Sequence, residues 1–150
     1  MIRPSDIHPD VELREFLQGQ IHVGLPGGGT KDVTVFGDWE KPTNGVPDDF
    51  LIIINNGDVG GVGMDTNFAR GYVAVSLYSK LNEDGTVKKN RITKILEQFD
   101  DLIERRNTGT YFFRYAVPQF ITPTTPNITS GYSITTLNLI WHTTNILNES

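Results

Sequence analysis

The sequence of 150 residues contains no cysteine and only three histidines. The absence of cysteine excludes disulfides, thiolate nucleophiles and cysteine-ligated zinc or iron–sulfur sites. Hydrophobic residues make up 37% and charged residues 21% of the chain, which is ordinary for a soluble globular protein and indicates neither a membrane span nor general disorder. This length predicts one domain with a core of its own.

Basic residues are also scarce, since 13 Lys and Arg stand against 18 Asp and Glu and give a formal net charge of -5. This balance disfavours a protein dedicated to binding nucleic-acid phosphates. The local basic clusters are residues 88–91 and 105–106, which we interpret as the solvated ends of a helix. Residues 1–6 are too polar for a signal peptide, so we expect the chain to be made in the cytoplasm.

The middle of the chain predicts two strands and one long helix. Residues 50–54 form a β-branched run typical of a strand buried on both faces, and residues 72–78 alternate with a period of two. Thr86 is placed to cap a helix that ends near Asn107 and Gly109. Apolar residues recur in it at helical spacing, and these are Ile92, Ile95, Leu96, Phe99, Leu102 and Ile103. One stripe of this helix is therefore expected to pack on a sheet.

Toward the N-terminus, Asp10 is expected to cap a short helix whose length Gly19 limits. The glycine-rich segment 22–31 predicts a long mobile loop before a strand at 32–36. Trp39 follows this strand and is available to pack over the edge of the sheet.

Toward the C-terminus, residues 110–117 predict a strand with alternating faces. Residues 120–130, with Pro123 and Pro126, are expected to wander over the surface or to reach a neighbouring subunit. Residues 132–144 predict an unusually long strand, which could extend beyond its own sheet and pair with another chain.

This order of elements predicts an α+β fold in a single domain covering residues 1–150. We expect a mostly antiparallel β-sheet with the long helix and the short N-terminal helix packed on one face.

No reactive motif accompanies this scaffold, and we predict no catalytic residue, cofactor or bound metal. The glycines of residues 57–63 lead into a strand instead of the helix that a dinucleotide-binding loop requires. The histidines lie far apart in the sequence, and a metal site built from distant residues such as Asp38, Asp58 or Asp65 stays open. Adjacent acids such as Asp100 and Asp101 point in different directions and are interpreted as solvated.

Residues 46–106 resemble the core of phage tail terminator proteins, also called tail-completion or head–tail joining proteins of long-tailed phages. The strand at 47–54, the loop at 57–64, the alternating strand at 71–80 and the helix at 87–106 occur in the order found in that family. The strand at 132–144 resembles the closing strand of the family. The match rests on the order and apolar patterning of elements and covers about two thirds of the chain.

The resemblance implies a structural virion protein at the tail–neck junction that forms a homo-oligomeric ring, typically of six subunits. Such a ring caps the tail tube, stops its polymerisation and contacts the tail tube protein and a head-completion or adaptor protein, while DNA passes through the lumen without specific binding. The alternatives are a head-completion or neck adaptor protein, a small α+β hydrolase and a monomeric binding module. Candidate contacts between subunits or rings are Leu25, Pro26, Gly27, Gly28, Asp58, Val59, Met64, Pro123, Pro126 and Trp141.

Overall fold

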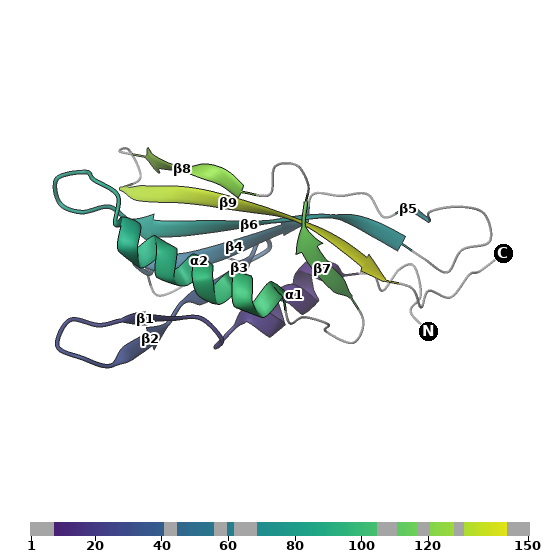
Figure 1. Ribbon diagram of the computed structural model, residues 1–150, viewed down its shortest axis with the longest axis horizontal. Helices are drawn as coiled ribbons and strands as arrows, with labels where there is room; N and C mark the ends of the chain where they lie inside the picture. The colour runs from purple at the N-terminus through teal and green to yellow at the C-terminus, as the bar shows by residue number, and fades with distance from the viewer. Residues whose placement is uncertain are drawn as a thin grey trace.

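The computed structural model describes residues 8–40, 45–55, 60–61, 69–104, 111–116, 121–127 and 131–143, with the backbone alone at 60–61, 69 and 121–127. The fold is α+β, as the sequence predicts (Figure 1). The elements in chain order are α1 (Pro9–Leu17), β1 (His22–Gly24), β2 (Thr30–Asp32), β3 (Thr34–Gly37), β4 (Asp49–Asn55), β5 (Gly60–Gly61), β6 (Ala69–Lys80), α2 (Lys89–Glu104), β7 (Phe112–Tyr115), β8 (Ile121–Asn127) and β9 (Tyr132–Thr143).

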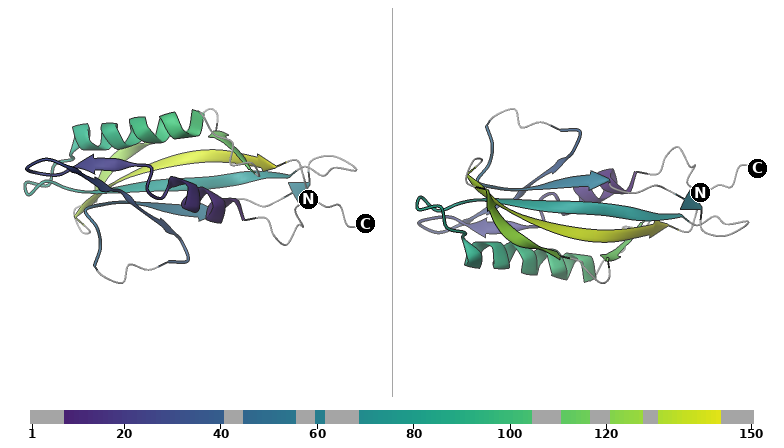
Figure 2. Two further views of the ribbon diagram at one scale, coloured as in Figure 1. Left: turned by 90° about the horizontal axis from the view of Figure 1, so that it is seen from below. Right: turned by 90° about the horizontal axis from the view of Figure 1, so that it is seen from above.

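Seven of the described strands form one twisted sheet in the order β3-β4-β6-β9-β7, with β5 beside β6 and β8 beside β9. Neighbouring strands are antiparallel except for the parallel pair β3 and β4. Residues of α1 and α2 share one apolar core with one face of this sheet. Figure 2 shows α2 lying along that face.

The long helix packs its predicted apolar stripe on the sheet. Ile92, Ile95, Phe99 and Ile103 are buried, which confirms the helical spacing of these residues. The helix begins at Lys89, however, and the predicted cap at Thr86 is wrong. The amide and hydroxyl of Thr86 both donate to the carboxylate of Asp84, which holds Thr86 in the preceding turn.

The short helix α1 begins at Pro9, two residues before the start that a cap at Asp10 predicts. His8 occupies the cap position and Asp10 lies buried inside the first turn, so the predicted capping role of Asp10 is wrong. Pro9 suits the first helical position because the amide that proline lacks has no helical partner there. The end is as predicted, since Gly19 follows the helix with a φ of 81°.

The glycine-rich segment predicted as a long loop is a β-hairpin. β1 and β2 pair antiparallel from His22 opposite Asp32 to Gly24 opposite Thr30. Gly27, Gly28 and Gly29 all have positive φ, a conformation that lets the chain reverse tightly between the strands. The predicted strand at 32–36 is interrupted at Val33, between β2 and β3.

The stretch with two prolines forms an outer strand of the sheet, contrary to the predicted surface excursion. β8 pairs with β9 from Ile121 to Asn127, with an irregular register between Thr122 and Thr125. Among the described strands β8 pairs with β9 alone, and Pro123 and Pro126 are tolerated because a strand paired on one side needs fewer of its amides.

The predicted long strand is confirmed as β9, but the predicted pairing of its edge with another chain is wrong. β6 pairs with β9 along all twelve residues from Tyr132 to Thr143. The other edge is paired with β8 from Tyr132 to Leu137 and with β7 from Leu139 to His142. β9 therefore lies inside the sheet and leaves no long edge open.

The alternation predicted for the other strands largely holds. Val73, Val75 and Leu77 of β6 face the core, and β7 also alternates. In β4, Leu51 and Ile53 are buried whereas Ile52 and Ile54 are only half-buried, so this strand is less enclosed than predicted.

Two side chains accept hydrogen bonds from the outward-facing amides of the edge strand β3. The amide of Val35 donates to Oε1 of Gln18, and the amide of Gly37 donates to Oε1 of Glu40. A Cβ on Gly37 would lie only 2.2 Å from the ring of Trp39, which therefore packs over this edge as predicted. Such coverage protects a sheet edge from further pairing.

Gly71 of β6 makes room for Trp141 of β9. A Cβ built on Gly71 would lie 2.8 Å from the indole, closer than real Cβ contacts allow. We expect Gly71→Ala to destabilise the protein by about 1 to 3 kcal/mol through overpacking, measured by urea unfolding. Gly24→Ala, where a Cβ meets nothing within 4 Å, is the matched control. Equal unfolding midpoints for the two variants would contradict this expectation.

Candidate functional site

An ion pair between a half-buried arginine and a buried carboxylate ties α2 to the sheet. Arg91 donates from Nε and Nη2 to Oδ2 of Asp49 at 2.8 and 2.6 Å. Ser79 donates to the other carboxylate oxygen at 2.8 Å, and the side chain of Asp49 is only 3% exposed. The hydrogen bond with Asp49 raises the pKa of Arg91 above its ordinary value, because it stabilises the charged guanidinium. The arrangement joins β4, β6 and α2.

Two side chains of the same helix hold the β1–β2 hairpin. Arg91 donates from Nη1 to the carbonyl of Gly24 at 3.4 Å. The side-chain amide of Gln98 donates to the carbonyl of His22 and accepts from the amide of His22. The hairpin is therefore a structured arm whose base is fixed on α2 and whose tip projects at one end of the molecule (Figure 1).

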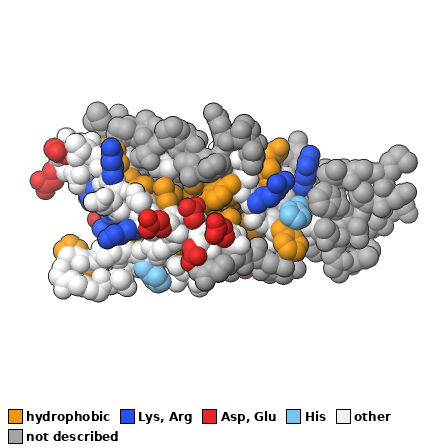
Figure 3. All heavy atoms as spheres, in the orientation of Figure 1, with side chains coloured by type: hydrophobic (Ala, Val, Ile, Leu, Met, Phe, Trp, Pro, Cys, Tyr) orange, Lys and Arg blue, Asp and Glu red, His pale blue; other side chains and the backbone are white. Residues whose placement is uncertain are grey.

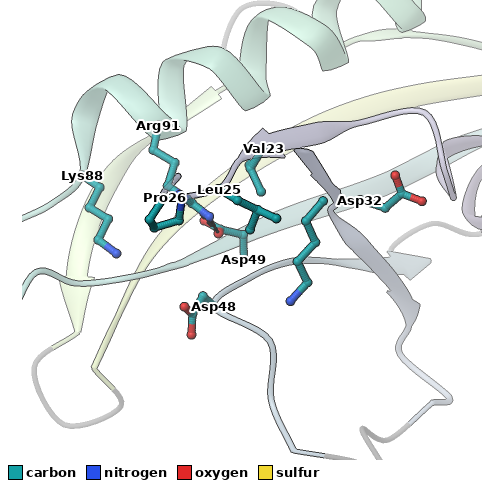
Figure 4. Close-up of a pocket in the computed structure, with 9 residues that line it drawn as sticks. Val23, Leu25, Pro26, Asp32, Asp48, Asp49, Lys88 and Arg91 are labelled. Atoms are coloured by element: carbon teal, nitrogen blue, oxygen red, sulfur yellow. Dashed lines mark hydrogen bonds and ion pairs between the residues drawn. The ribbon is translucent and has the colours of Figure 1, made fainter. Parts of the chain in front are cut away.

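A hollow of about 180 Å³ lies between this arm, α2 and the start of β4 (Figure 4). Val23, Leu25 and Pro26 supply its apolar lining. Its charged lining balances three basic side chains against three acidic ones, which are Lys31, Lys88, Arg91, Asp32, Asp48 and Asp49. Since the charges balance, the hollow favours neither anions nor cations.

The sheet face opposite the core, here called the outer face, carries aromatic side chains at one end. Phe50 stacks on Tyr78 with a centroid distance of 4.8 Å, and Tyr132 packs edge-on against Phe50. Tyr72, farther along β6 on the same face, is 54% exposed. Phe50 is 7% exposed, so the aromatic cluster itself is largely enclosed, and Tyr72 is the exposed aromatic side chain among the described residues of this face.

At the other end of the outer face lies what we call the cationic patch, formed by Arg70, Arg114, Phe112, Ile140 and His142. The register places Arg70 and Phe112 on either side of His142, and Arg114 beside Ile140. Both arginines are exposed and form no ion pair with another described residue, while His142 stacks on Phe112 at 5.0 Å. Burial and, to a lesser degree, Arg114 lower the pKa of His142.

A pH titration tests this environment. We expect an NMR titration to give His142 a pKa below the ordinary 6.5, and Arg114→Ala to raise that pKa without fully restoring it, because burial remains. Since the unfolded chain binds the proton more readily, the contribution of His142 to stability is complete above the ordinary pKa of about 6.5 and is lost as the pH falls below that value and through the lower pKa of the folded state. An unchanged pKa in the Arg114→Ala variant would contradict the electrostatic effect assigned to Arg114. Arg70→Ala serves as the comparison.

The exposed side of α2 bears four acidic residues at helical spacing, here called the acidic stripe: Glu97, Asp100, Asp101 and Glu104. Tyr115 of β7 donates its hydroxyl to Asp100, and burial together with this contact raises the pKa of Tyr115. Figure 3 shows acidic side chains gathered over α2, with basic side chains to either side. Within the described residues, α2 has no acid in its first turn and no base in its last turn. A helix dipole favours acids near the N-terminus and bases near the C-terminus, so it does not account for the position of the acidic stripe.

The predicted contact residues at the hairpin tip are accessible. Leu25 is 43% exposed, and Pro26, Gly27 and Gly28 are exposed beside it. Trp141 is 0% exposed, so its predicted contact with a neighbour is wrong. Its alternating position in β9 turns the indole into the core, against Tyr111 at 5.6 Å.

The remaining predicted contacts are only partly placed. Pro123 and Pro126 lie in β8, where the structure describes the backbone alone. Asp58, Val59 and Met64 lie outside the described residues, as does Asp65 of the metal hypothesis.

The described residues contain no group of three metal-ligating side chains. His8, His22 and His142 belong to different parts of the fold, and His22 pairs with Asp32 at 2.7 Å. Ser79 donates to a carboxylate, but it is 1% exposed and out of reach of a substrate. Neither described helix is long and apolar enough to cross a membrane.

The acidic stripe and the cationic patch are absent from the residues predicted as contacts. The stripe has a signal in the sequence, because acids at 97, 100, 101 and 104 repeat at helical spacing. The cationic patch has no signal in the sequence, because the pairing of β6 and β7 with β9 is what brings Arg70 and Arg114 to one surface.

Comparison of the chain with protein-family models, with curated proteins and with solved structures found no match.

Proposed function

We propose that this protein is a ring-forming tail terminator of a long-tailed bacteriophage. In this role it caps the tail tube, stops its polymerisation and joins the tail to the head connector. The elements behind the resemblance, β4, β6, α2 and β9, are present in the expected order.

The observation that carries the proposal is the presence of two unlike surfaces on one subunit. A ring built head to tail needs a different surface on each side of every subunit. Here one surface is the acidic stripe of α2, and another is the outer face with its cationic patch and exposed Tyr72.

The partners proposed for the two ends of the ring are the tail tube protein and a head-completion or adaptor protein. The accessible hairpin tip, with Leu25, is suited to a contact with a neighbouring ring. A formal net charge of -5 suits a lumen through which DNA slides, because a strongly basic lumen would retain the phosphates.

Electron microscopy of a phage that lacks the protein tests the proposal. We expect DNA-filled heads without tails, and free tails of uncontrolled length, because nothing stops the addition of tube subunits. Complementation with the wild-type chain is the control. Joined particles with normal tails would refute the proposed function, and unjoined tails of normal length would favour a neck adaptor instead.

A further inference from the structure

We propose that the acidic stripe of one copy docks on the cationic patch of the next copy. The partner is thus a second copy of this chain. This inference rests on the proposed ring and names the surfaces through which its subunits meet.

The first support is complementary charge. Among the described strand positions of the outer face, Arg70, Lys80 and Arg114 are basic, His142 carries an imidazole, and none is acidic. Lys80 lies 3.8 Å from Asp48, so the two arginines are the cations without a described ion-pair partner. The acidic stripe supplies the opposite sign, and arginine binds carboxylates through paired hydrogen bonds.

The second support is matched spacing. Glu97 and Glu104 are both exposed and lie seven residues apart, which is about 10.5 Å along a helix. Arg70 and Arg114 flank β9 two strands apart and are offset by two residues, which gives a separation of about 12 Å. Flexible side chains accommodate this difference, so both glutamates of one helix can meet both arginines of one patch.

The third support is the composition around the arginines. Phe112, Ile140 and the exposed Tyr72 surround them on the outer face. Arginine and aromatic residues are enriched where binding energy concentrates in protein interfaces. A nucleic-acid contact fits less well, because the two arginines of the patch are few for binding phosphates and the formal net charge of the chain is -5.

Charge reversal provides the test. The outer-face variant carries Arg70→Glu and Arg114→Glu, and the helix variant carries Glu97→Lys and Glu104→Lys. All four residues are exposed, so both variants are expected to keep the wild-type circular dichroism and melting temperature. The matched control carries Glu15→Lys and Lys89→Glu, which reverse exposed charges elsewhere.

Self-association of the full chain is measured by light scattering coupled to size-exclusion chromatography, and by electron microscopy. We expect each variant alone to lose roughly tenfold or more in association constant, because like charges then face each other. The control associates as the wild type does. An equimolar mixture of the two variants regains assembly, since each then offers the charge that the other needs, and added salt weakens assembly of wild type and mixture alike.

The outcomes separate the docking contact from the proposed function. If the wild type forms rings and each variant alone forms them equally well, the docking contact is refuted while the ring role stands. If mixing restores association that ends at two subunits, the contact is supported and the ring role fails. A wild type that stays monomeric also refutes the docking contact. So does an outer-face variant that associates as the wild type does but no longer retards duplex DNA in a gel.

Discussion

Replacing Phe99 by alanine is expected to lower the free energy of unfolding by about 3 to 5 kcal/mol. Phe99 is fully buried on the sheet side of α2 and packs beside Tyr115 of β7 at a centroid distance of 6.3 Å. Truncation removes apolar contacts and leaves a cavity between the helix and the sheet, which cannot close completely.

Chemical denaturation followed by circular dichroism measures this loss. Thr93→Ala, on the exposed side of the same helix, is the control and is expected to change stability by less than about 0.5 kcal/mol. A Phe99→Ala midpoint within error of the Thr93→Ala midpoint would place Phe99 outside the core and contradict the packing of α2.

Replacing Arg91 by methionine is expected to cost about 3 to 5 kcal/mol, because the buried carboxylate of Asp49 loses its guanidinium donors and keeps the Ser79 hydroxyl among the described donors. The same change releases the contact of Arg91 with Gly24 at the hairpin. We therefore expect limited proteolysis to cleave between Leu25 and Gly29 faster than in the wild type.

A second substitution separates the ion pair from packing. The double variant Arg91→Met with Asp49→Asn removes both charges and is expected to recover part of the stability lost by Arg91→Met alone. Lys94→Met, at an exposed position of α2, is the control for the methionine itself. A double variant less stable than Arg91→Met would show that the charge of Asp49 is not what makes that variant unstable.

The sequence predicted the parts of the fold whose side chains repeat with the period of their element. The stripe of α2 from Ile92 to Ile103 and the alternation of β6 and β9 reflect burial directly, because a helix or strand brings its repeated positions to one face. Gly19 ended a helix as predicted, since the signal and its effect are local.

The segments that were predicted wrongly are those in which one residue type is compatible with two kinds of structure. Glycine at residues 27–29 forms the turn of a hairpin, although the same glycines also suit a mobile loop. Proline at 123 and 126 is tolerated in the outer strand β8, although it is typical of irregular segments. Trp141 was predicted as a contact residue, but the alternation of β9 places its indole in the core.

The candidate surfaces were harder to predict, because they depend on contacts between distant residues. Arg91 and Asp49 lie 42 positions apart, and no local pattern joins them. Arg70 and Arg114 come together only once β6 and β7 flank β9. The spacing of the acids on α2 is visible in the sequence, but the sequence does not show the cationic patch that we propose as their partner.

The covered edge of β3 limits how copies of this chain can polymerise. A fibre that grows by adding strands needs an open edge at both ends of every sheet. Gln18 and Glu40 already hold the outward amides of β3, so edge-to-edge growth in this direction is blocked. A second copy could add a strand at this edge only after Gln18 and Glu40 release these two amides, so fibre growth from β3 carries the cost of breaking both hydrogen bonds.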